Sequence, residues 1–302
     1  MRYLSKILLF TIILSSLNGQ SHLKIFHEAE AQTKKNMEEV IIEVKPNYYM
    51  IQPNGAVAGN IGVFVSDDGL ILVDDQWEVT KKHVIKALRK ISQKKIKYII
   101  NTHFHYDHVD GNKAFAKMRI PIVAHKNVRL MLKNDHTLDI PSGIIQPKHP
   151  KEALPTLTFE KGLDIHESGE TISIYHFGPA HTNGDAVIQF NEANILHTGD
   201  LFVTYGFPFI DFNSGGNLPG LIHTLNKIIE LSNDETIIMP GHGNLCNKND
   251  VIGLRDKLVI SLDAIKQGKA NGKSIEEILE NFPIDIGGFK EVTVRRTYQA
   301  LE

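Results

Sequence analysis

The chain has 302 residues, of which 42% are hydrophobic and 23% are charged, a composition typical of a soluble globular protein. Its formal net charge of −2 gives no electrostatic reason to expect a nucleic acid or an anionic membrane as partner. Cys246 is the only cysteine, which excludes an intramolecular disulfide and a metal cage built from thiolates alone. Any metal ion must therefore be held by histidine and carboxylate side chains.

Residues 1–19 have the order of a secretory signal peptide. Arg2 and Lys6 precede an apolar run over residues 7–14, and small and polar residues follow it. The run is too short to span a bilayer comfortably as a mature helix. We expect cleavage near Gly19, a periplasmic or secreted mature chain, and no stable membrane insertion after cleavage; an uncleaved N-terminal anchor is the alternative. A polar stretch, helical or loosely ordered, is expected from there to about Glu39.

Strands and helices alternate through the first half of the predicted fold. Strands are expected over residues 40–52 and 59–75, and the second segment turns at the Ser-Asp-Asp-Gly sequence of residues 66–69. Apolar residues at helical spacing predict a helix over residues 80–93. A buried strand over 95–103, a helix over 111–118 and a strand over 120–125 are expected to follow.

The second half repeats this alternation. A strand followed by a Gly-Pro turn is predicted over residues 171–185, and two strands joined at 191–194 are predicted over 186–202. Helices are predicted over 218–231 and 250–268, on either side of a strand and turn over 236–243. The pattern indicates an α/β fold in which helices cover sheet layers. We expect one domain over residues 20–302, with its core beginning at about residue 44.

Candidate metal ligands follow the ends of predicted strands, where α/β sheets place their functional sites. Residues 103–108 read His-Phe-His-Tyr-Asp-His, and single candidates recur later in turns that contain glycine, which lets backbone approach a crowded site. The seven candidates are His103, His105, Asp107, His108, His181, Asp200 and His242. This number is about what two hydrolytic metal ions need when each keeps a position open. A solvated histidine-rich tract that binds metal loosely is the alternative.

The spacing of the first cluster predicts how its side chains point. His103 and His105 are two residues apart, so an extended segment directs both to the same side, and Phe104 and Tyr106 to the core. Histidines outside the cluster and the turns are expected to be structural, solvated or packed: His136, His149, His166, His197 and His223.

These residues resemble the metallo-β-lactamase superfamily. The stretch from residue 103 to 108 matches that family's HxHxDH signature at every fixed position, and His181, Asp200 and His242 follow in the family's order and spacing. Asp74 matches an acidic residue that members carry at the end of an early strand. The resemblance runs from about Val44 to the C-terminus.

The resemblance implies a four-layer αβ/βα sandwich with a dinuclear zinc site at one edge. Each ion would be held by three residues and a seventh would bridge them: His103, His105 and His181 for one, Asp107, His108 and His242 for the other, and Asp200 between them. Asp74 would lie behind the ligands and orient them. Iron and manganese are alternatives to zinc, because imidazole and carboxylate suit them as well.

Such a site implies a hydrolase that cleaves a carbonyl bond of a small molecule, namely an ester, lactone, thioester or amide. Water shared by two divalent ions becomes a hydroxide near neutral pH, and Asp107 is the catalytic candidate that orients it and passes on a proton. The aromatic loop that follows Asp200 either contacts the substrate or packs over the site through Tyr205, Phe207, Phe209 and Phe212. Asn217 resembles an asparagine with which some lactamase members polarise the carbonyl.

Two other functions are compatible with the sequence. A class B-type metallo-β-lactamase is one, although members of the commonest zinc subclass carry Cys at the position of Asp200 and Lys at that of Val203. A non-catalytic periplasmic zinc-binding protein is the other. The sequence makes no prediction about the oligomeric state.

Overall fold

The computed structural model describes residues 38–54, 58–139 and 144–301. The predicted signal peptide and the polar stretch up to residue 37 lie outside these residues, whereas Glu38 and Glu39 begin the first strand. Within the described ranges, no helix combines the length and the apolar character that a membrane crossing requires.

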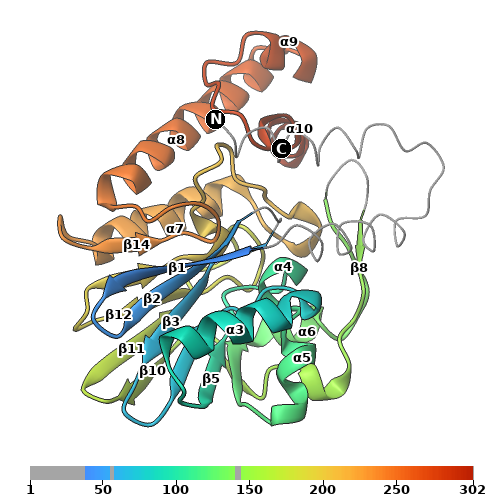
Figure 1. Ribbon diagram of the computed structural model, residues 1–302. Coiled ribbons are helices and arrows are strands. Elements are labelled where there is room, and N and C mark those ends of the chain that lie inside the picture. Colours follow the sequence, from blue (N-terminus) through green and yellow to red (C-terminus); the bar gives the residue numbers. More distant parts are fainter. Residues whose placement is uncertain (1–37, 55–57, 140–143, 302) are drawn as a thin grey trace.

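Two β-sheets stack face to face at the centre of the molecule (Figure 1). One has seven strands in the order β1-β2-β3-β4-β5-β6-β9, namely β1 (Glu38–Lys45), β2 (Tyr48–Asn54), β3 (Ile61–Val65), β4 (Leu70–Val73), β5 (Ile96–Ile100), β6 (Ile122–His125) and β9 (Leu157–Phe159). The other follows chain order with β10 (Gly162–Glu167), β11 (Glu170–Tyr175), β12 (Val187–Phe190), β13 (Ile195–His197) and β14 (Ile237–Met239). A separate two-stranded ribbon pairs β7 (His136–Thr137) with β8 (Ile145–Gln146).

Helices cover the outer faces of both sheets (Figure 1). The α-helices are α3 (Lys81–Ile91), α4 (Tyr106–Val109), α5 (Asn112–Phe115), α6 (Lys126–Met131), α7 (Leu218–Leu231), α8 (Lys248–Ala270), α9 (Ile275–Glu280) and α10 (Lys290–Ala300). Short 3₁₀ helices are η1 (Glu78–Thr80), η2 (Ala116–Met118), η3 (Lys151–Ala153), η4 (Gly199–Leu201) and η5 (Phe212–Ser214).

The alternation of side chains along the strands builds the layers. In β4, Ile71 and Val73 face the second sheet, whereas Leu70 and Leu72 face α3. Alternate residues of a strand point to opposite faces of a sheet. Because both faces of this strand are buried, it is apolar throughout.

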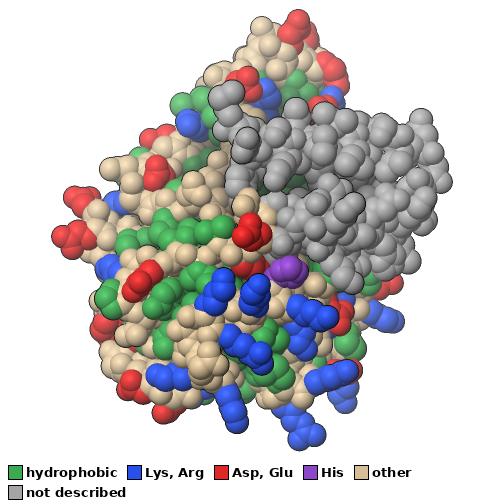
Figure 2. Space-filling model, in the orientation of Figure 1, with side chains coloured by type: hydrophobic (Ala, Val, Ile, Leu, Met, Phe, Trp, Pro, Cys, Tyr) green, Lys and Arg blue, Asp and Glu red, His purple; other side chains and the backbone are tan. Residues whose placement is uncertain are grey.

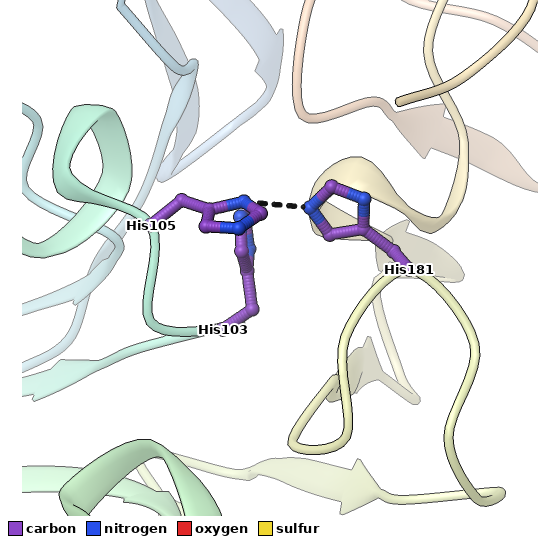
Figure 3. Close-up of side chains that lie close together, drawn as sticks. All are labelled: His103, His105 and His181. Carbon is purple, nitrogen blue, oxygen red and sulfur yellow. Dashed lines mark hydrogen bonds between the residues drawn. The ribbon is translucent and has the colours of Figure 1, made fainter. Parts of the chain in front are cut away.

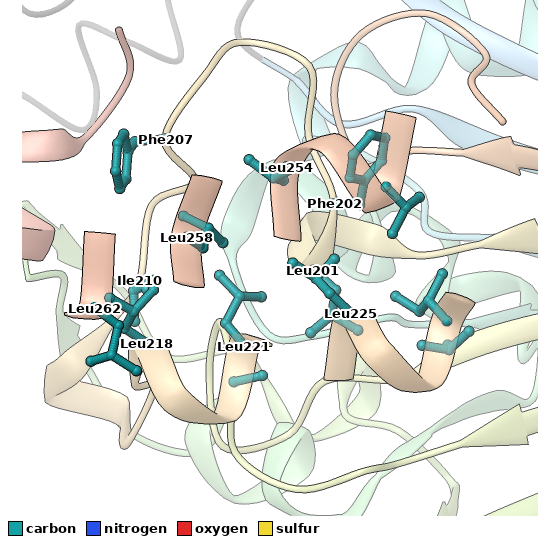
Figure 4. Close-up of a cluster of buried hydrophobic side chains, with 14 of the residues drawn as sticks. Leu201, Phe202, Phe207, Ile210, Leu218, Leu221, Leu225, Leu254, Leu258 and Leu262 are labelled. Carbon is teal, nitrogen blue, oxygen red and sulfur yellow. The ribbon is translucent and has the colours of Figure 1, made fainter. Parts of the chain in front are cut away.

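The outer face of the second sheet packs against α7 and α8. Leu221 and Leu225 of α7 lie against Leu254 and Leu258 of α8 (Figure 4), and Val187 of β12 belongs to the same cluster. The order of layers is therefore helix, sheet, sheet, helix, which confirms the predicted four-layer sandwich.

The predicted turns at residues 66–69 and 191–194 are confirmed, because each joins two antiparallel strands. The predicted helix over 111–118 is instead split into α5 and η2, which ends at Arg119 in the left-handed region (φ 55°). Several elements were not predicted from the sequence, namely the polar edge strand β10, the short elements α6, β7, β8 and β9, and the C-terminal helices α9 and α10. Each is either short or weakly apolar, so periodicity alone did not reveal it.

Charged side chains are distributed unevenly over the surface. The basic residues of α3 are Lys81, Lys82, Lys86, Arg89 and Lys90, and residues 81–91 contain no acidic residue. Figure 2 shows cationic side chains gathered on this face of the molecule. The net charge of −2 therefore does not describe this face.

Phe190 lies between the two sheets, with its ring centroid 5.5 Å from that of Tyr48 and 6.0 Å from that of Phe64. We expect Phe190→Ala to lower the free energy of unfolding by about 3–5 kcal/mol, because it leaves a cavity in the core. Urea unfolding measures this change. Leu163→Ala, at a side chain that is 38% exposed, is the control and should shift stability by no more than about 0.5 kcal/mol. Equal losses in both variants would contradict this description of the core.

His197, at the end of β13, is fully buried, and burial lowers its pKa from 6.5 to about 4 despite the opposing charge of Asp74. The unfolded chain therefore binds this proton more readily, and stability should fall as the pH drops from about 6.5 to about 4. Between pH 7 and pH 5 we expect His197 to contribute about 2 kcal/mol to that loss in the metal-free protein. His197→Gln should remove this component from pH-dependent urea unfolding; an unchanged pH dependence would contradict the prediction.

Candidate metal centre

The predicted ligands meet at one edge of the two sheets because several strands end there. β4 and β5 are parallel, and so are β13 and β14, so the carboxyl ends of each pair lie together. His103 and His105 follow β5 directly, and Asp107 and His108 lie in the short helix α4. The chain thus changes from strand to helix inside the cluster, as its sequence predicts.

The other three candidates come from the second half of the chain. His181 lies in the loop between β11 and β12, Asp200 lies in η4 after β13, and His242 follows β14. Six of the seven candidates are buried, and His242 is half-buried. Burial of so many ionisable groups is costly unless each is paired or coordinates a metal.

The seven side chains form three overlapping groups, in each of which the potential ligand atoms lie within 4.8 Å of one another. The groups are His103, His105 and His181; His103, His108 and Asp200; and Asp107, His108 and His242. Figure 3 shows the first group, with Nδ1 of His105 2.9 Å from Nε2 of His181. Because the first and the third of these groups share no residue, the arrangement has room for more than one ion.

Hydrogen bonds behind the cluster engage Nδ1 of His108 and Nδ1 of His103, so the Nε2 atom of each ring is the one that faces the other candidate ligands. Nδ1 of His108 lies 2.8 Å from Oδ2 of Asp74, and Nδ1 of His103 lies 3.0 Å from Oγ1 of Thr102. The Thr102 hydroxyl itself donates to Asp74 (2.7 Å), which leaves its oxygen to accept from His103. Asp74 therefore occupies the position behind the ligands that the sequence predicts.

Nε2 of His103 is buried and has no hydrogen-bond partner among the residues that the structure describes. Buried polar atoms are normally satisfied, so an unpaired imidazole nitrogen inside a cluster of donors fits a metal ligand. The donor set of imidazole and carboxylate suits zinc, iron or manganese.

The loop before η5 fixes the other two imidazoles of the first group. Nδ1 of His181 donates to the carbonyl of Phe209 (2.7 Å), and Nε2 of His105 lies 3.2 Å from Oδ2 of Asp211. Asp211 was not among the site residues predicted from the sequence. One signal was available, since Asp211 is the only acidic residue between Phe202 and Asn217.

Charge pairing is strongest around the second group. Burial disfavours the charged form of His108, but Asp200 and Asp107 outweigh it and raise the pKa of His108 well above its usual value. Asp200 and Asp107 likewise outweigh burial at His242 and raise its pKa to about 9. In return, these imidazoles overcome the effect of burial and lower the pKa of Asp107 and of Asp200. Both carboxylates are therefore anionic and available as ligands.

Two glycines allow the backbone to approach the cluster. A Cβ atom at Gly59 would lie 2.4 Å from Cε1 of His108, and one at Gly241 would lie 1.9 Å from Oδ1 of Asp200. Neither distance is possible for a real side chain. The expectation that glycine permits close approach is met at Gly241, next to His242.

The structure places the three predicted substrate contacts in different surroundings. Phe207 is fully buried and packs in the hydrophobic cluster that includes residues of α7 and α8. Asn217 caps helix α7, where its Oδ1 accepts from the amide of Gly220 (2.8 Å). Tyr205, by contrast, is half-buried with its ring centroid 6.0 Å from that of His242.

The C-terminal region supplies an aromatic side chain beside the cluster that the sequence analysis missed. The ring of Phe289 lies 6.0 Å from that of Tyr205 and 5.3 Å from that of Phe209, whose own ring lies 5.6 Å from His105. We call Tyr205, Phe209 and Phe289 the aromatic wall. It places apolar surface next to the candidate ligands.

Known proteins are similar to this chain over most of its length. The sequence profile of the metallo-beta-lactamase superfamily matches residues 54–242. A probable metallo-hydrolase of Methanocaldococcus jannaschii is 27% identical over 186 residues, which cover 58% of this chain and 83% of the relative. Metallo-beta-lactamase IND-1 of Chryseobacterium indologenes is 23% identical over 222 residues, covering 71% and 85%. A linear primary-alkylsulfatase of Pseudomonas sp. is 51% identical over 191 residues, but the match covers only 34% of that protein.

Solved structures share the fold. The sec-alkylsulfatase Pisa1 from Pseudomonas sp. matches 95% of this chain and 54% of its own, with a TM-score of 0.68 and 15% identity. The DIM-1 metallo-beta-lactamase matches 72% of this chain and 97% of its own, with a TM-score of 0.58 and 18% identity. The family profile covers more than half of the chain. All seven candidate ligands lie within it, and the last of them, His242, is its final residue. The chain therefore belongs to the metallo-β-lactamase superfamily and is a hydrolase of that superfamily.

Proposed function

We propose that this chain is an exported dinuclear zinc hydrolase that cleaves a carbonyl bond of a small molecule. The observation that carries the proposal is that two of the three ligand groups are separate. The group of His103, His105 and His181 and the group of Asp107, His108 and His242 share no residue, so each can serve one ion. Asp200 lies between them, 3.1 Å from Nε2 of His108 and 3.8 Å from Nε2 of His181.

Zinc bound in these groups would polarise a carbonyl and supply an activated water near neutral pH. Asp107 is the residue best placed to handle the proton. Its Oδ2 lies 3.2 Å from Nε2 of His242, and His108 and His242 outweigh burial and lower its pKa, so it is anionic. A carboxylate in this position can hold the proton and deliver it to the leaving group.

The aromatic wall supports an uncharged, partly apolar substrate. Burial, with a further contribution from Asp200, raises the pKa of Tyr205 well above 10, so its phenol stays neutral. The amide of Phe209 donates to the Tyr205 oxygen (3.4 Å), which leaves the phenol proton free to be offered to a substrate oxygen. Apolar walls with a few placed polar groups are typical of small-molecule sites.

A metallo-β-lactamase is the second candidate, and similarity to IND-1 supports it. Val203, which stands where lactamases of the commonest zinc subclass carry Lys, is 2% exposed and cannot present a group to a drug carboxylate. Asp200 in place of Cys also disfavours that activity. The partial match to an alkylsulfatase supports testing a sulfate ester as well. A non-catalytic zinc-binding protein would bind metal without turning over any substrate.

His103→Ala should release at least one zinc ion and abolish nearly all turnover, because Nε2 of His103 is buried inside the ligand cluster and has no partner among the described residues. Metal content of the purified variant, measured by mass spectrometry, checks this. His166→Ala, at an exposed residue of β10, is the matched control and should keep the metal content of the wild type. Full metal content in His103→Ala would overturn the assignment of the site.

A panel of substrates separates the candidate activities. We expect kcat/KM of the zinc-loaded chain to be higher for a lactone or a thioester than for a chromogenic β-lactam, because Val203 and Asp200 replace the lactamase residues. An alkyl sulfate completes the panel. Faster β-lactam turnover would make the second candidate correct. A saturable but inert zinc site would favour the non-catalytic protein instead.

A further inference from the structure

His105 is held from two sides by residues that lie far from it in the sequence. Its ring bonds Asp211, which in turn bonds His136 of β7. Its neighbours in the chain bond Gln146 of β8. We call Asp211, His136 and Gln146 the His105 brace.

On the ring side, Oδ2 of Asp211 lies 3.2 Å from Nε2 of His105 and 2.8 Å from Nε2 of His136. Asp211 is fully buried, and the same carboxylate oxygen lies within hydrogen-bond distance of the ring nitrogens of both histidines. An anionic carboxylate accepts hydrogen bonds only. Nε2 of His105 must therefore carry the proton, which leaves the Nδ1 lone pair facing His181.

On the backbone side, the buried amide of Gln146 joins the residues before and after His105. Its Oε1 accepts from the amide of Tyr106 (3.1 Å), and its Nε2 donates to the carbonyl of Phe104 (2.8 Å). Both bonds fix the peptide from which the His105 ring projects. The ribbon of β7 and β8 thus contributes to both sides of the brace.

Asp211 also connects His105 to the opposite ligand. Its backbone amide donates to the carbonyl of His181 (2.9 Å). The residue therefore fixes the ring of one candidate ligand and the main chain of another. An aspartate that only stabilised the fold would not need to contact two candidate ligands of the same group, as Asp211 does.

We propose that Asp211 and His136 are positioning residues that hold His105 in the tautomer with Nδ1 free, and thereby set the metal affinity of the three-histidine group. The inference rests on the proposed function, because it assigns a role in that metal site. Hydrogen-bonded partners of ligand histidines fix tautomer and orientation, and their loss weakens metal binding about 10- to 100-fold.

The test compares Asp211→Asn, His136→Ala and the control Asp135→Asn with the wild type. Asp135 lies next to His136, is exposed, and bonds the amide of Lys148 rather than any candidate ligand. Zinc affinity is measured by competition with a chromophoric chelator. The tautomer of His105 in the metal-free chain is read from its ¹⁵N chemical shifts, which respond to protonation of one nitrogen and not to a general loss of stability.

We expect Asp211→Asn to lower the affinity for one of two zinc ions about 10- to 100-fold and to leave the affinity for the other unchanged. His136→Ala should lower the affinity for the same ion by a smaller factor. This second variant keeps the test decisive if Asp211→Asn does not fold. Asp135→Asn should bind both ions as the wild type does. In the metal-free wild type, the shifts should show a proton on Nε2 of His105, and Asp211→Asn should move it toward Nδ1.

The outcomes separate this inference from the proposed function. If Asp211→Asn and His136→Ala both bound zinc as tightly as the wild type, the inference alone would be overturned. A proton on Nδ1 of His105 in the metal-free wild type would also overturn it. A wild-type chain that binds no zinc would overturn the proposed function and the inference together.

Discussion

The choice of nitrogen that each buried imidazole presents is the constraint on which the site depends. A neutral imidazole has one donor and one acceptor nitrogen, and the hydrogen bond made by one decides what the other can do. Thr102, Asp74, Phe209 and Asp211 each accept from one nitrogen of a candidate ligand. The opposite nitrogens then converge on the space between the two sheets' edges.

The layered fold supplies these acceptors from unrelated parts of the chain. Asp74 follows β4, Thr102 follows β5, and Phe209 and Asp211 lie in the loop before η5. The rigid packing of both sheets fixes the strand ends, and Gly59 and Gly241 let the backbone come close enough to fill the remaining space. The core and the site are therefore coupled, since a shift of one sheet against the other would separate the two halves of the cluster.

The elements with strong apolar periodicity could be predicted from the sequence, as could the candidate ligands that the structure brings together. The helices α7 and α8 and the hairpin of β3 and β4 have clear periodic or turn signals, and residues 103–108 form a dense motif. The acidic residue behind the ligands, Asp74, was also predictable because it follows an apolar strand.

Other parts of the site depend on tertiary contacts that leave no local pattern. His136 was expected to be merely solvated or packed, yet it bonds Asp211 75 residues away. Phe289 reaches the aromatic wall from the C-terminal region, where paired glycines precede it. The sequence could not decide whether Phe207 packs or contacts a substrate, because an aromatic residue in a loop has the same sequence signal in both cases.

The central claim is that two metal ions lie in this cluster, each held by its own group of three residues, with Asp200 between the two groups. Anomalous diffraction from zinc-loaded crystals, collected at the zinc absorption edge, tests it most directly. The account predicts two peaks, one among His103, His105 and His181 and the other among Asp107, His108 and His242. A single peak, or peaks outside these residues, would contradict it.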